Sequence, residues 1–206
     1  MTGKFITIEG LEGAGKTTQA QVLVKWLESK EREIVRTREP GGTPVAEKIR
    51  NLVLEHHEEA INPVAELLLV FAARKQHLEG LIKPSIDSGK WVVSDRFTDA
   101  TYAYQGGGRG LKESLIRDLE ITFLDDFQPD LTIWFDCDAE VGLARASARG
   151  QLDRIEQESM AFFNRCRTAY AKRAEAHPQR FIRIDANNSE AQVTEELLSS
   201  LEAYFG

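Results

Sequence analysis

The chain has 206 residues, of which 42% are hydrophobic and 29% charged, and its formal net charge is −7. These proportions are typical of a globular domain with a proper core, and the acidic balance without a basic run argues against DNA or RNA as a partner. No apolar stretch approaches the roughly 20 residues of a membrane span, so we expect no membrane association.

Short apolar runs then alternate with longer amphipathic segments, a pattern that favours a parallel sheet covered by helices on both faces. Strands are predicted at 4–9, 34–38, 90–94, 131–136 and 181–185. Helices are predicted at 16–30, 45–55, 63–87, 98–105, 112–127, 139–149, 157–176 and 190–204. This order predicts a single domain, 1–206, with a three-layer α/β/α fold, a five-stranded parallel sheet and ligands at the carboxyl ends of the strands.

In two segments, prolines or glycines predict a particular backbone conformation. The helix predicted over 63–87 has Pro63 in its first turn, where proline fits, and Pro84 is expected to kink or end it. The triplet Gly106-Gly107-Gly108 is expected to act as a flexible joint.

The most specific motif is a glycine-rich loop that follows the first strand and opens the first helix. It consists of Gly10, Leu11, Glu12, Gly13, Ala14, Gly15, Lys16 and Thr17, with Thr18 next in the helix. Backbone N–H groups of such a loop bind phosphate oxygens, its lysine reaches the β- and γ-phosphates, and its threonine hydroxyl can ligate Mg²⁺. A glycine-rich turn that only caps a helix is the alternative, and the strand–loop–helix context argues against it. The motif predicts a nucleoside triphosphate site (a P-loop).

The remaining strand ends narrow the class of P-loop protein. The base-reading Asn-Lys-x-Asp stretch of switch GTPases and the Asp-Glu strand end of motor ATPases are both missing from the sequence. Instead the third strand ends in Ser94-Asp95-Arg96-Phe97, where Asp95 can hold Mg²⁺ and Arg96 can bind phosphate oxygens. A capping acid beside a surface arginine is the alternative interpretation of this pair.

Three further patterns fit an acceptor nucleotide, and each also has a structural explanation. Arg38 to Thr43 reads Arg-Glu-Pro-Gly-Gly-Thr, which is either an acceptor-phosphate loop or a plain turn. Phe71 and Arg74 share a helix face and could read a base, although Phe71 could equally pack in the core. One face of the next helix carries Thr101, Tyr104 and Gln105, which suit a base edge and a steric wall or an ordinary half-buried surface.

Four of these motifs occur in the same order as in thymidylate kinases: the P-loop, the segment 38–43, the Phe71–Arg74 pair and Asp95-Arg96-Phe97. The chain resembles a bacterial member of that family over essentially its whole length. The resemblance implies Mg·ATP-dependent phosphorylation of dTMP to dTDP in dTTP synthesis. It also implies a homodimer formed through long helices. Another P-loop nucleoside monophosphate or deoxynucleoside kinase is the nearest alternative. A nucleotide-binding switch or regulatory ATPase, or a purely structural protein, is a more distant one.

The resemblance also implies roles for single residues. Phe71 would stack on thymine and Arg74 would bond its carbonyl, with Thr101 near the base edge and Tyr104 against the sugar 2′ position. Glu12 would meet the sugar 3′-hydroxyl. Arg38 and Arg96 would hold the acceptor phosphate, and the predicted substrate site also includes Pro40 and Gln105.

A lid is expected at about 146–156, within a basic segment that resembles the lid of this family. Some members place an arginine in the P-loop where this chain has Gly13, so Arg149 and Arg154 are the candidates to act on the transferred phosphoryl group. Arg145 would lie beside the adenine. The alternative for these arginines is a solvated helix end.

The last expectations concern location. No basic-then-apolar leader precedes the first strand, and Cys137 and Cys166 show neither disulfide nor metal-ligand spacing. We therefore expect a reduced, cytoplasmic environment.

Overall fold

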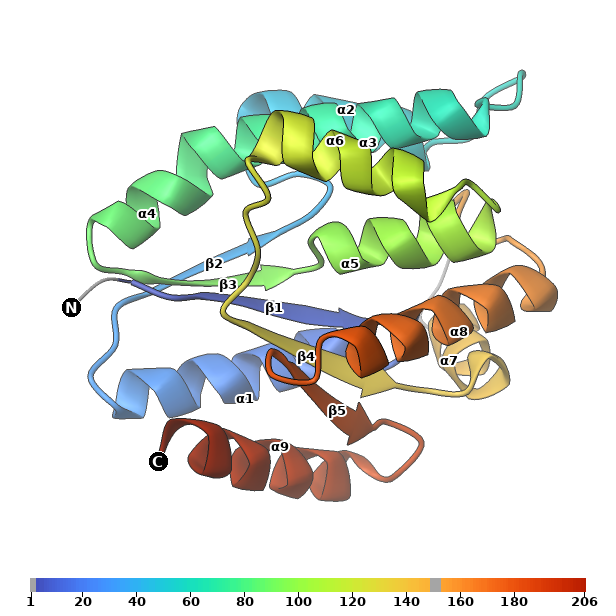
Figure 1. Ribbon diagram of the computed structural model, residues 1–206. Coiled ribbons are helices and arrows are strands. Elements are labelled where there is room, and N and C mark those ends of the chain that lie inside the picture. Colours follow the sequence, from blue (N-terminus) through green and yellow to red (C-terminus); the bar gives the residue numbers. More distant parts are fainter. Residues whose placement is uncertain (1–2, 149–152) are drawn as a thin grey trace.

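Five parallel strands form the centre of the structure, in the order β2-β3-β1-β4-β5 (Figure 1). The computed structural model describes residues 3–148 and 153–206. The strands are β1 Phe5–Gly10, β2 Ile34–Arg38, β3 Trp91–Asp95, β4 Leu131–Asp136 and β5 Phe181–Asp185. Each lies within a residue of its predicted range. β1 is the central strand and pairs with both β3 and β4, so its carboxyl end is surrounded by the ends of its neighbours.

Side chains of β1 alternate between two helical layers, as the pleat of a strand requires. Ile6 and Ile8 pack in the core beneath α1 (Lys16–Ser29) and α9 (Glu190–Phe205). Phe5 points to the opposite face, which is covered by α3 (Pro63–His77), α5 (Thr98–Thr101), α6 (Glu113–Leu124) and α8 (Met160–Ala176) (Figure 1). The three-layer α/β/α fold predicted from the sequence is thereby confirmed.

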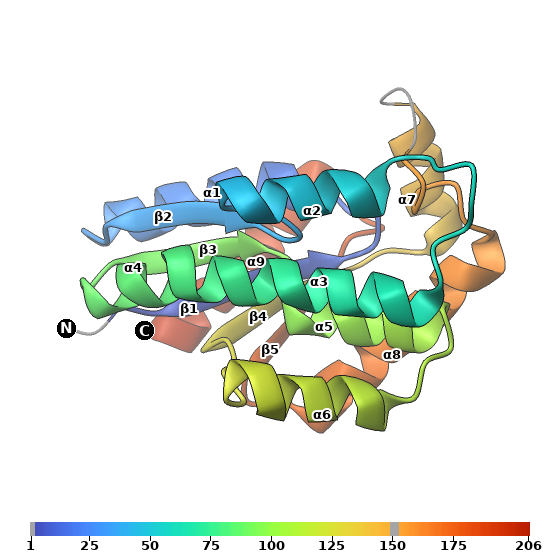
Figure 2. The same cartoon turned by 90° about the horizontal axis from the view of Figure 1, so that it is seen from above.

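The remaining helices surround the carboxyl edge of the sheet or extend α3. They are α2 (Pro44–Leu54), which lies beside α3 (Figure 2), α4 (Lys83–Asp87) and α7 (Ala139–Ser147). Side-chain caps fix where several helices begin: Thr43, Asn62 and Ser159 each accept from a backbone N–H of the following turn. No helix in the described ranges is long and apolar enough to cross a bilayer.

The helix predicted over 63–87 is interrupted ahead of Pro84, as expected from that proline. α3 ends at His77, a π-helical turn follows at Leu78–Ile82, and α4 then contains Pro84 in its first turn. Proline lacks the N–H that would continue the regular α-helical ladder, and a π-helical turn is one way to absorb the break.

The glycine triplet is not a flexible joint. It ends a π-helical turn at Tyr102–Gly108 that packs tightly against α8. A Cβ atom on Gly107 would lie 2.7 Å from the carbonyl oxygen of Arg165, and one on Gly108 would lie 2.5 Å from the ring of Phe162. The glycines therefore allow two helical segments to approach closely, which the local sequence could not distinguish from flexibility.

Candidate active site

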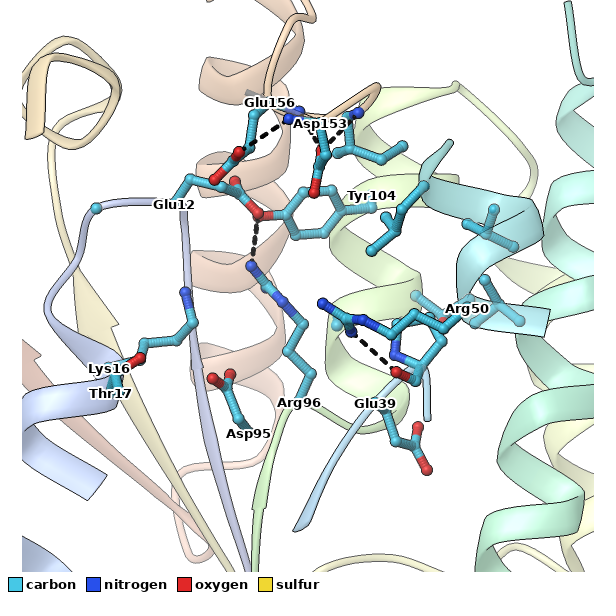
Figure 3. A pocket seen from close by; sticks show the side chains of 18 of the residues that line it. Glu12, Lys16, Thr17, Glu39, Arg50, Asp95, Arg96, Tyr104, Asp153 and Glu156 are labelled. Carbon is cyan, nitrogen blue, oxygen red and sulfur yellow. Dashed lines mark hydrogen bonds and ion pairs between the residues drawn. The ribbon is translucent and has the colours of Figure 1, made fainter. Parts of the chain in front are cut away.

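A cavity of about 540 Å³ opens at the carboxyl ends of the strands, where the fold predicts a ligand site (Figure 3). Its walls come from the P-loop, the loop after β2, helices α2, α3, α5 and α7, the π-helical turn after α5, the end of β3 and the segment that begins at Asp153. The predicted site residues that line it are Glu12, Gly13, Gly15, Lys16, Thr17, Thr18, Pro40, Arg74, Asp95, Arg96, Thr101, Tyr104, Gln105 and Arg145. The sequence motifs thus converge on one cavity.

The P-loop has the conformation that its glycines permit. Gly13 and Gly15 adopt positive φ angles of +71° and +80°, and α1 begins directly after Gly15. A Cβ atom on Gly13 would lie 1.9 Å from the carbonyl oxygen of Gly142 in α7. Close packing against α7 therefore excludes any larger residue at position 13, including the arginine found there in some thymidylate kinases.

Lys16 lies inside the loop rather than in solvent. Its Nζ donates to the carbonyl oxygens of Gly10, at 3.2 Å, and Leu11, at 2.7 Å. Burial, reinforced by the nearby Arg96, lowers the pKa of Lys16 to about 8. A polyphosphate bound by the loop would favour the charged form, so ligand binding and protonation of Lys16 support each other.

Arg96 connects the P-loop to the helical face of the cavity. Its Nη2 donates to Glu12 Oε1 at 2.6 Å and to the Tyr104 hydroxyl oxygen at 3.1 Å, while Nη1 donates to the Gly10 carbonyl at 2.9 Å (Figure 3). The Tyr104 hydroxyl in turn donates to Glu12 Oε2 at 2.6 Å. Burial by itself would raise the pKa of Glu12, but Arg96 and Lys16 overcome that effect and lower it. Glu12 is therefore an anion held between two cations.

Asp95 and Thr17 fit a divalent metal ion. Both line the cavity, and Asp95 Oδ1 is buried without a hydrogen-bond partner. A buried carboxylate oxygen is costly unless a donor or a cation occupies it. Mg²⁺ prefers carboxylate, hydroxyl, phosphate and water oxygens and usually takes only one or two ligands from the protein. The two side chains are of the types such an ion requires.

Arg74 is 1% exposed and is held by three partners. Nε donates to Glu39 Oε2 at 2.7 Å, Nη1 donates to Thr101 Oγ1 at 2.8 Å, and Nη2 donates to the Phe97 carbonyl at 3.0 Å. An arginine has five N–H donors, so the guanidinium is fixed while two donors remain for a ligand. This arrangement suits a residue that reads a polar group at one set position.

Glu39 and His77 support Arg74, and neither was singled out from the sequence. His77 Nδ1 lies 3.0 Å from Glu39 Oε1, and its Nε2 lies 2.6 Å from Thr37 Oγ1. A Cβ atom on Gly42 would lie 2.3 Å from His77 Nε2, which explains the second glycine of the loop after β2. The sequence held a signal for each residue. His77 follows Arg74 by three residues and so shares its helix face. Glu39 directly follows a strand, where a glutamate that becomes buried needs a hydrogen-bond donor.

Phe71 lies beside Arg74, with 5.2 Å between its ring centroid and the guanidinium carbon, and its predicted stacking on thymine stays a prediction. Phe71 is 4% exposed and packs in the core cluster with Phe5, Leu67 and Phe97, and it does not line the cavity. Val70 lines the cavity instead, one helical turn before Arg74. Successive residues of a helix point about 100° apart, so Phe71, three residues before Arg74, and Val70, four residues before it, face different surroundings.

Arg38, at the end of β2, does not face the cavity in this structure, and its predicted contact with the acceptor phosphate stays a prediction. The Arg38 side chain is 53% exposed, pairs with Glu47 at 2.8 Å and does not line the cavity. Arg50, on α2, lines the cavity and donates to the Pro40 carbonyl at 2.9 Å (Figure 3). Burial, and after it the nearby Arg38, lowers the pKa of Arg50. Arg50 was missed because nothing in its local sequence separates it from a surface arginine.

Of the three predicted lid arginines, two are described. Arg145 lines the cavity and donates to the Ala186 carbonyl at 2.8 Å. Arg154 does not line the cavity: its Nε donates to the Val53 carbonyl at 2.8 Å, and its Nη2 pairs with buried Glu66 at 2.5 Å.

Arg149, and with it residues 150–152 of the predicted lid, lie outside the described residues. The cavity also receives Asp153 and Glu156 from the end of that segment, two acids that sequence reasoning missed.

Comparison with known proteins decides the family. The family model "Thymidylate kinase" matches residues 8–197. A thymidylate kinase of Teredinibacter turnerae is 51% identical over 204 residues, which are 99% of this chain and 100% of that protein. Another, of Pseudomonas fluorescens, is 55% identical over 197 residues, covering 96% of this chain and 94% of its own. The chain belongs to the thymidylate kinase family.

A solved structure supports the same assignment at the level of the fold. The crystal structure of thymidylate kinase from Ehrlichia chaffeensis superposes with a TM-score of 0.78 at 33% identity, covering 98% of this chain and 99% of the other. The chain is accordingly a kinase that transfers a phosphoryl group from ATP to dTMP and so produces dTDP. This agrees with the activity expected from its motifs.

The buried Glu9, at the end of β1, generates a prediction for stability. Burial, with Asp99 nearby, raises its pKa from 4.5 to about 8. The folded state therefore retains a proton that the unfolded chain has already lost, so stability falls as pH rises through this interval. We expect the free energy of unfolding of the wild type, relative to Glu9→Gln, to decline between pH 5 and pH 8.

Urea denaturation at a series of pH values measures this difference. Glu202→Gln is the control: this carboxylate is exposed and its pKa is lowered, so its effect lies at more acidic pH. A difference between wild type and Glu9→Gln that stays flat from pH 5 to pH 8 would contradict the prediction.

Proposed function

We propose that the cavity holds Mg·ATP and dTMP together, with the P-loop on the donor side and three arginines on the acceptor side. The observation that carries this proposal is the convergence of Lys16, Thr17, Asp95 and Arg96 on one cavity. Thr17 and Asp95 would hold Mg²⁺, which when bound neutralises the β- and γ-phosphates. Lys16 and the loop N–H groups would hold the same phosphates.

On the acceptor side, Arg96 and Arg50 would bind the dTMP phosphate, and Arg74 would donate to the base. Support comes from their common position around the cavity and from the two donors that Arg74 retains. Phe71, whose ring lies against Arg74, would stack on thymine, with Val70 also facing the cavity and Thr101 and Gln105 along the base edge. Glu12, anchored by Arg96 and Tyr104, would accept from the sugar 3′-hydroxyl.

The reaction needs no dedicated general base. A phosphate monoester has a second pKa near 6, so at neutral pH the acceptor is mostly a dianion that can attack directly. The protein has to bring two polyanions together and stabilise a loose, in-line transition state through positioning and charge. Lys16 and Arg96 would supply that positive charge.

The lid arginines complete the proposal. Arg149 and Arg154 stay the candidates for the transferred phosphoryl group, and Arg145 would lie beside the adenine, next to Ala186. Arg154 would have to leave Glu66 to reach a phosphate. A lid at about 146–156 remains a prediction. We also propose a cytoplasmic location, which the unpaired, buried thiols of Cys137 and Cys166 support.

Lys16→Met tests the donor site. Loss of the ammonium should lower kcat at least about a hundredfold, because phosphoryl transfer depends on charge stabilisation, while the thermal midpoint stays close to that of the wild type. The assay is coupled ADP release with Mg·ATP and dTMP. Lys25→Met, an exposed lysine on the same helix, is the matched control and should retain turnover. Near-normal activity of Lys16→Met would remove the donor-site argument.

Arg50→Met and Arg38→Met test the acceptor site as a pair. If Arg50 binds the dTMP phosphate, its substitution should raise KM for dTMP about tenfold or more, as expected for a lost charged hydrogen bond. Arg38→Met should change that KM less than about twofold, because Arg38 lies outside the cavity. Initial-rate kinetics at saturating ATP measure both. A larger increase in KM for dTMP from Arg38→Met than from Arg50→Met would assign the acceptor phosphate to Arg38 instead.

A homodimer is the remaining part of the proposal, and exposed apolar side chains support it. Of the nine large hydrophobic residues that are exposed in the described part of the chain, seven lie on α2, α3 and α6, and α3 lies between the other two helices (Figure 2): Val45, Leu52, Val64, Leu68, Leu115, Ile121 and Phe123. Concentrated exposed apolar area is typical of a protein interface. We propose that two copies associate through this helical face.

Leu68→Glu and Phe123→Glu place a charge in that face and should convert a dimer to a monomer, since an unpaired charge at an apolar interface is costly. Light scattering after size-exclusion chromatography measures the mass. Met160→Glu, an exposed apolar residue on α8, is the control and should leave the mass unchanged. A wild-type monomer, or dimers of both variants, would contradict the assignment.

A further inference from the structure

A buried polar layer contacts Arg96 and the backbone beside it. It consists of Glu9, the next-to-last residue of β1, and Tyr170 of α8. Both are fully buried, and neither lines the cavity. The two groups therefore do not touch a nucleotide in that cavity, and any effect they have on the reaction passes through another residue.

The first contact of this layer is with the backbone at Arg96. Arg96 has a positive φ of +75°, which costs free energy for a side chain other than glycine and persists only where the surroundings enforce it. Its N–H donates to the Ile8 carbonyl at 2.9 Å, and its own carbonyl accepts from Ser94 Oγ at 2.8 Å. The next N–H, of Phe97, donates to Glu9 Oε1 at 2.7 Å. Glu9 thus secures the far side of the left-handed turn.

The second contact is with the guanidinium. The Tyr170 hydroxyl donates to Glu9 Oε2 at 2.7 Å and accepts from Arg96 Nη1 at 3.3 Å. The ring of Tyr170 stacks on Trp134 with 6.1 Å between centroids and 23° between planes. The phenol is held by its ring and by its hydroxyl, so it presents an oxygen at a set position beneath Arg96.

A carboxyl group at this place is expensive. Burial raises the pKa of Glu9 to about 8, and nearby Asp99 raises it further. An apolar side chain would avoid this cost, as replacements of buried charged groups by packed apolar residues show. The carboxyl group gives what an apolar side chain cannot, namely two acceptors that join the Arg96 turn to the phenol of Tyr170.

We propose that Glu9 and Tyr170 are positioning residues, which hold the backbone and the side chain of Arg96 in the orientation that binds the acceptor phosphate. The inference rests on the proposed role of Arg96 at that phosphate. Without the pair, Arg96 keeps its charge but samples more orientations, so part of its interaction with dTMP is lost as entropy.

A double-mutant cycle tests this inference with binding as the readout, so that inactive variants remain measurable. The four proteins are wild type, Tyr170→Phe, Arg96→Ala and the double variant, and calorimetric titration gives their dTMP affinities. Tyr170→Phe removes one oxygen and leaves the ring on Trp134. We expect it to weaken dTMP binding about tenfold in the wild type, and less than about twofold when Arg96 is already alanine.

The outcomes separate the inference from the function on which it rests. Arg96→Ala should weaken dTMP binding about a hundredfold, and an unchanged affinity would overturn the role of Arg96 together with the inference. An equal loss from Tyr170→Phe in both backgrounds, or no loss in the wild type, overturns the inference alone. ATP affinity should stay within about twofold in Tyr170→Phe, because Lys16 and Thr17 are untouched.

A matched control and a second arm complete the design. Tyr102→Phe removes another buried hydroxyl that donates to a carboxylate, Glu120 at 2.5 Å, away from the cavity, and should leave dTMP affinity unchanged.

Glu9→Gln retains an acceptor for Phe97 and a polar group for the phenol, so it should keep the affinity within about twofold. Glu9→Ala lacks both and should lose about tenfold. Equal losses in the two Glu9 variants would show that hydrogen-bonding groups at this position are not what holds Arg96, and would overturn the proposal.

Discussion

The guanidinium of Arg96 bonds to both halves of the cavity, and the geometry of the site depends on that cross-link. It contacts the P-loop through Gly10 and Glu12 and the α5-side wall through Tyr104. It also lies close enough to Lys16 to lower the lysine pKa. Two cations can share so small a volume because Glu12 lies between them and stays ionised. A phosphate-transfer site needs this concentration of positive charge before the nucleotides bind.

The same arrangement of an arginine with an acid recurs at Arg74 and Arg154, whereas Arg50 and Arg145 donate to backbone carbonyls. Arg96 is paired with Glu12, Arg74 with Glu39, and Arg154 with Glu66. A buried pair of this kind contributes little net stability, because removing two charges from water offsets most of their attraction. What it contributes is a fixed orientation. The acids are therefore best understood as parts of the site that keep cations in place.

Close approaches between backbones provide the rest of the geometry. Gly13 allows α7 to contact the P-loop, Gly42 allows the loop after β2 to lie over His77, and Gly107 and Gly108 allow α8 to pack on the wall that carries Tyr104. In each case an added methyl group would overlap a neighbouring backbone or side chain. The positions of the helices around the sheet, and not only their existence, are thus encoded by glycines.

Sequence alone determined the layered fold, the strands to within a residue, the P-loop and the grouping of Asp95, Arg96, Arg74 and Tyr104 at one edge. These follow from periodicity, from local motifs and from the rule that parallel strands end together. The tertiary structure decided that Val70 and not Phe71 faces the cavity, that Arg50 and not Arg38 does, and that the glycine triplet packs instead of bending. It also revealed Glu39, His77, Glu9 and Tyr170 behind the arginines. Those features depend on contacts between segments far apart in the chain, and on which side of a helix or strand meets them, which local patterns do not record.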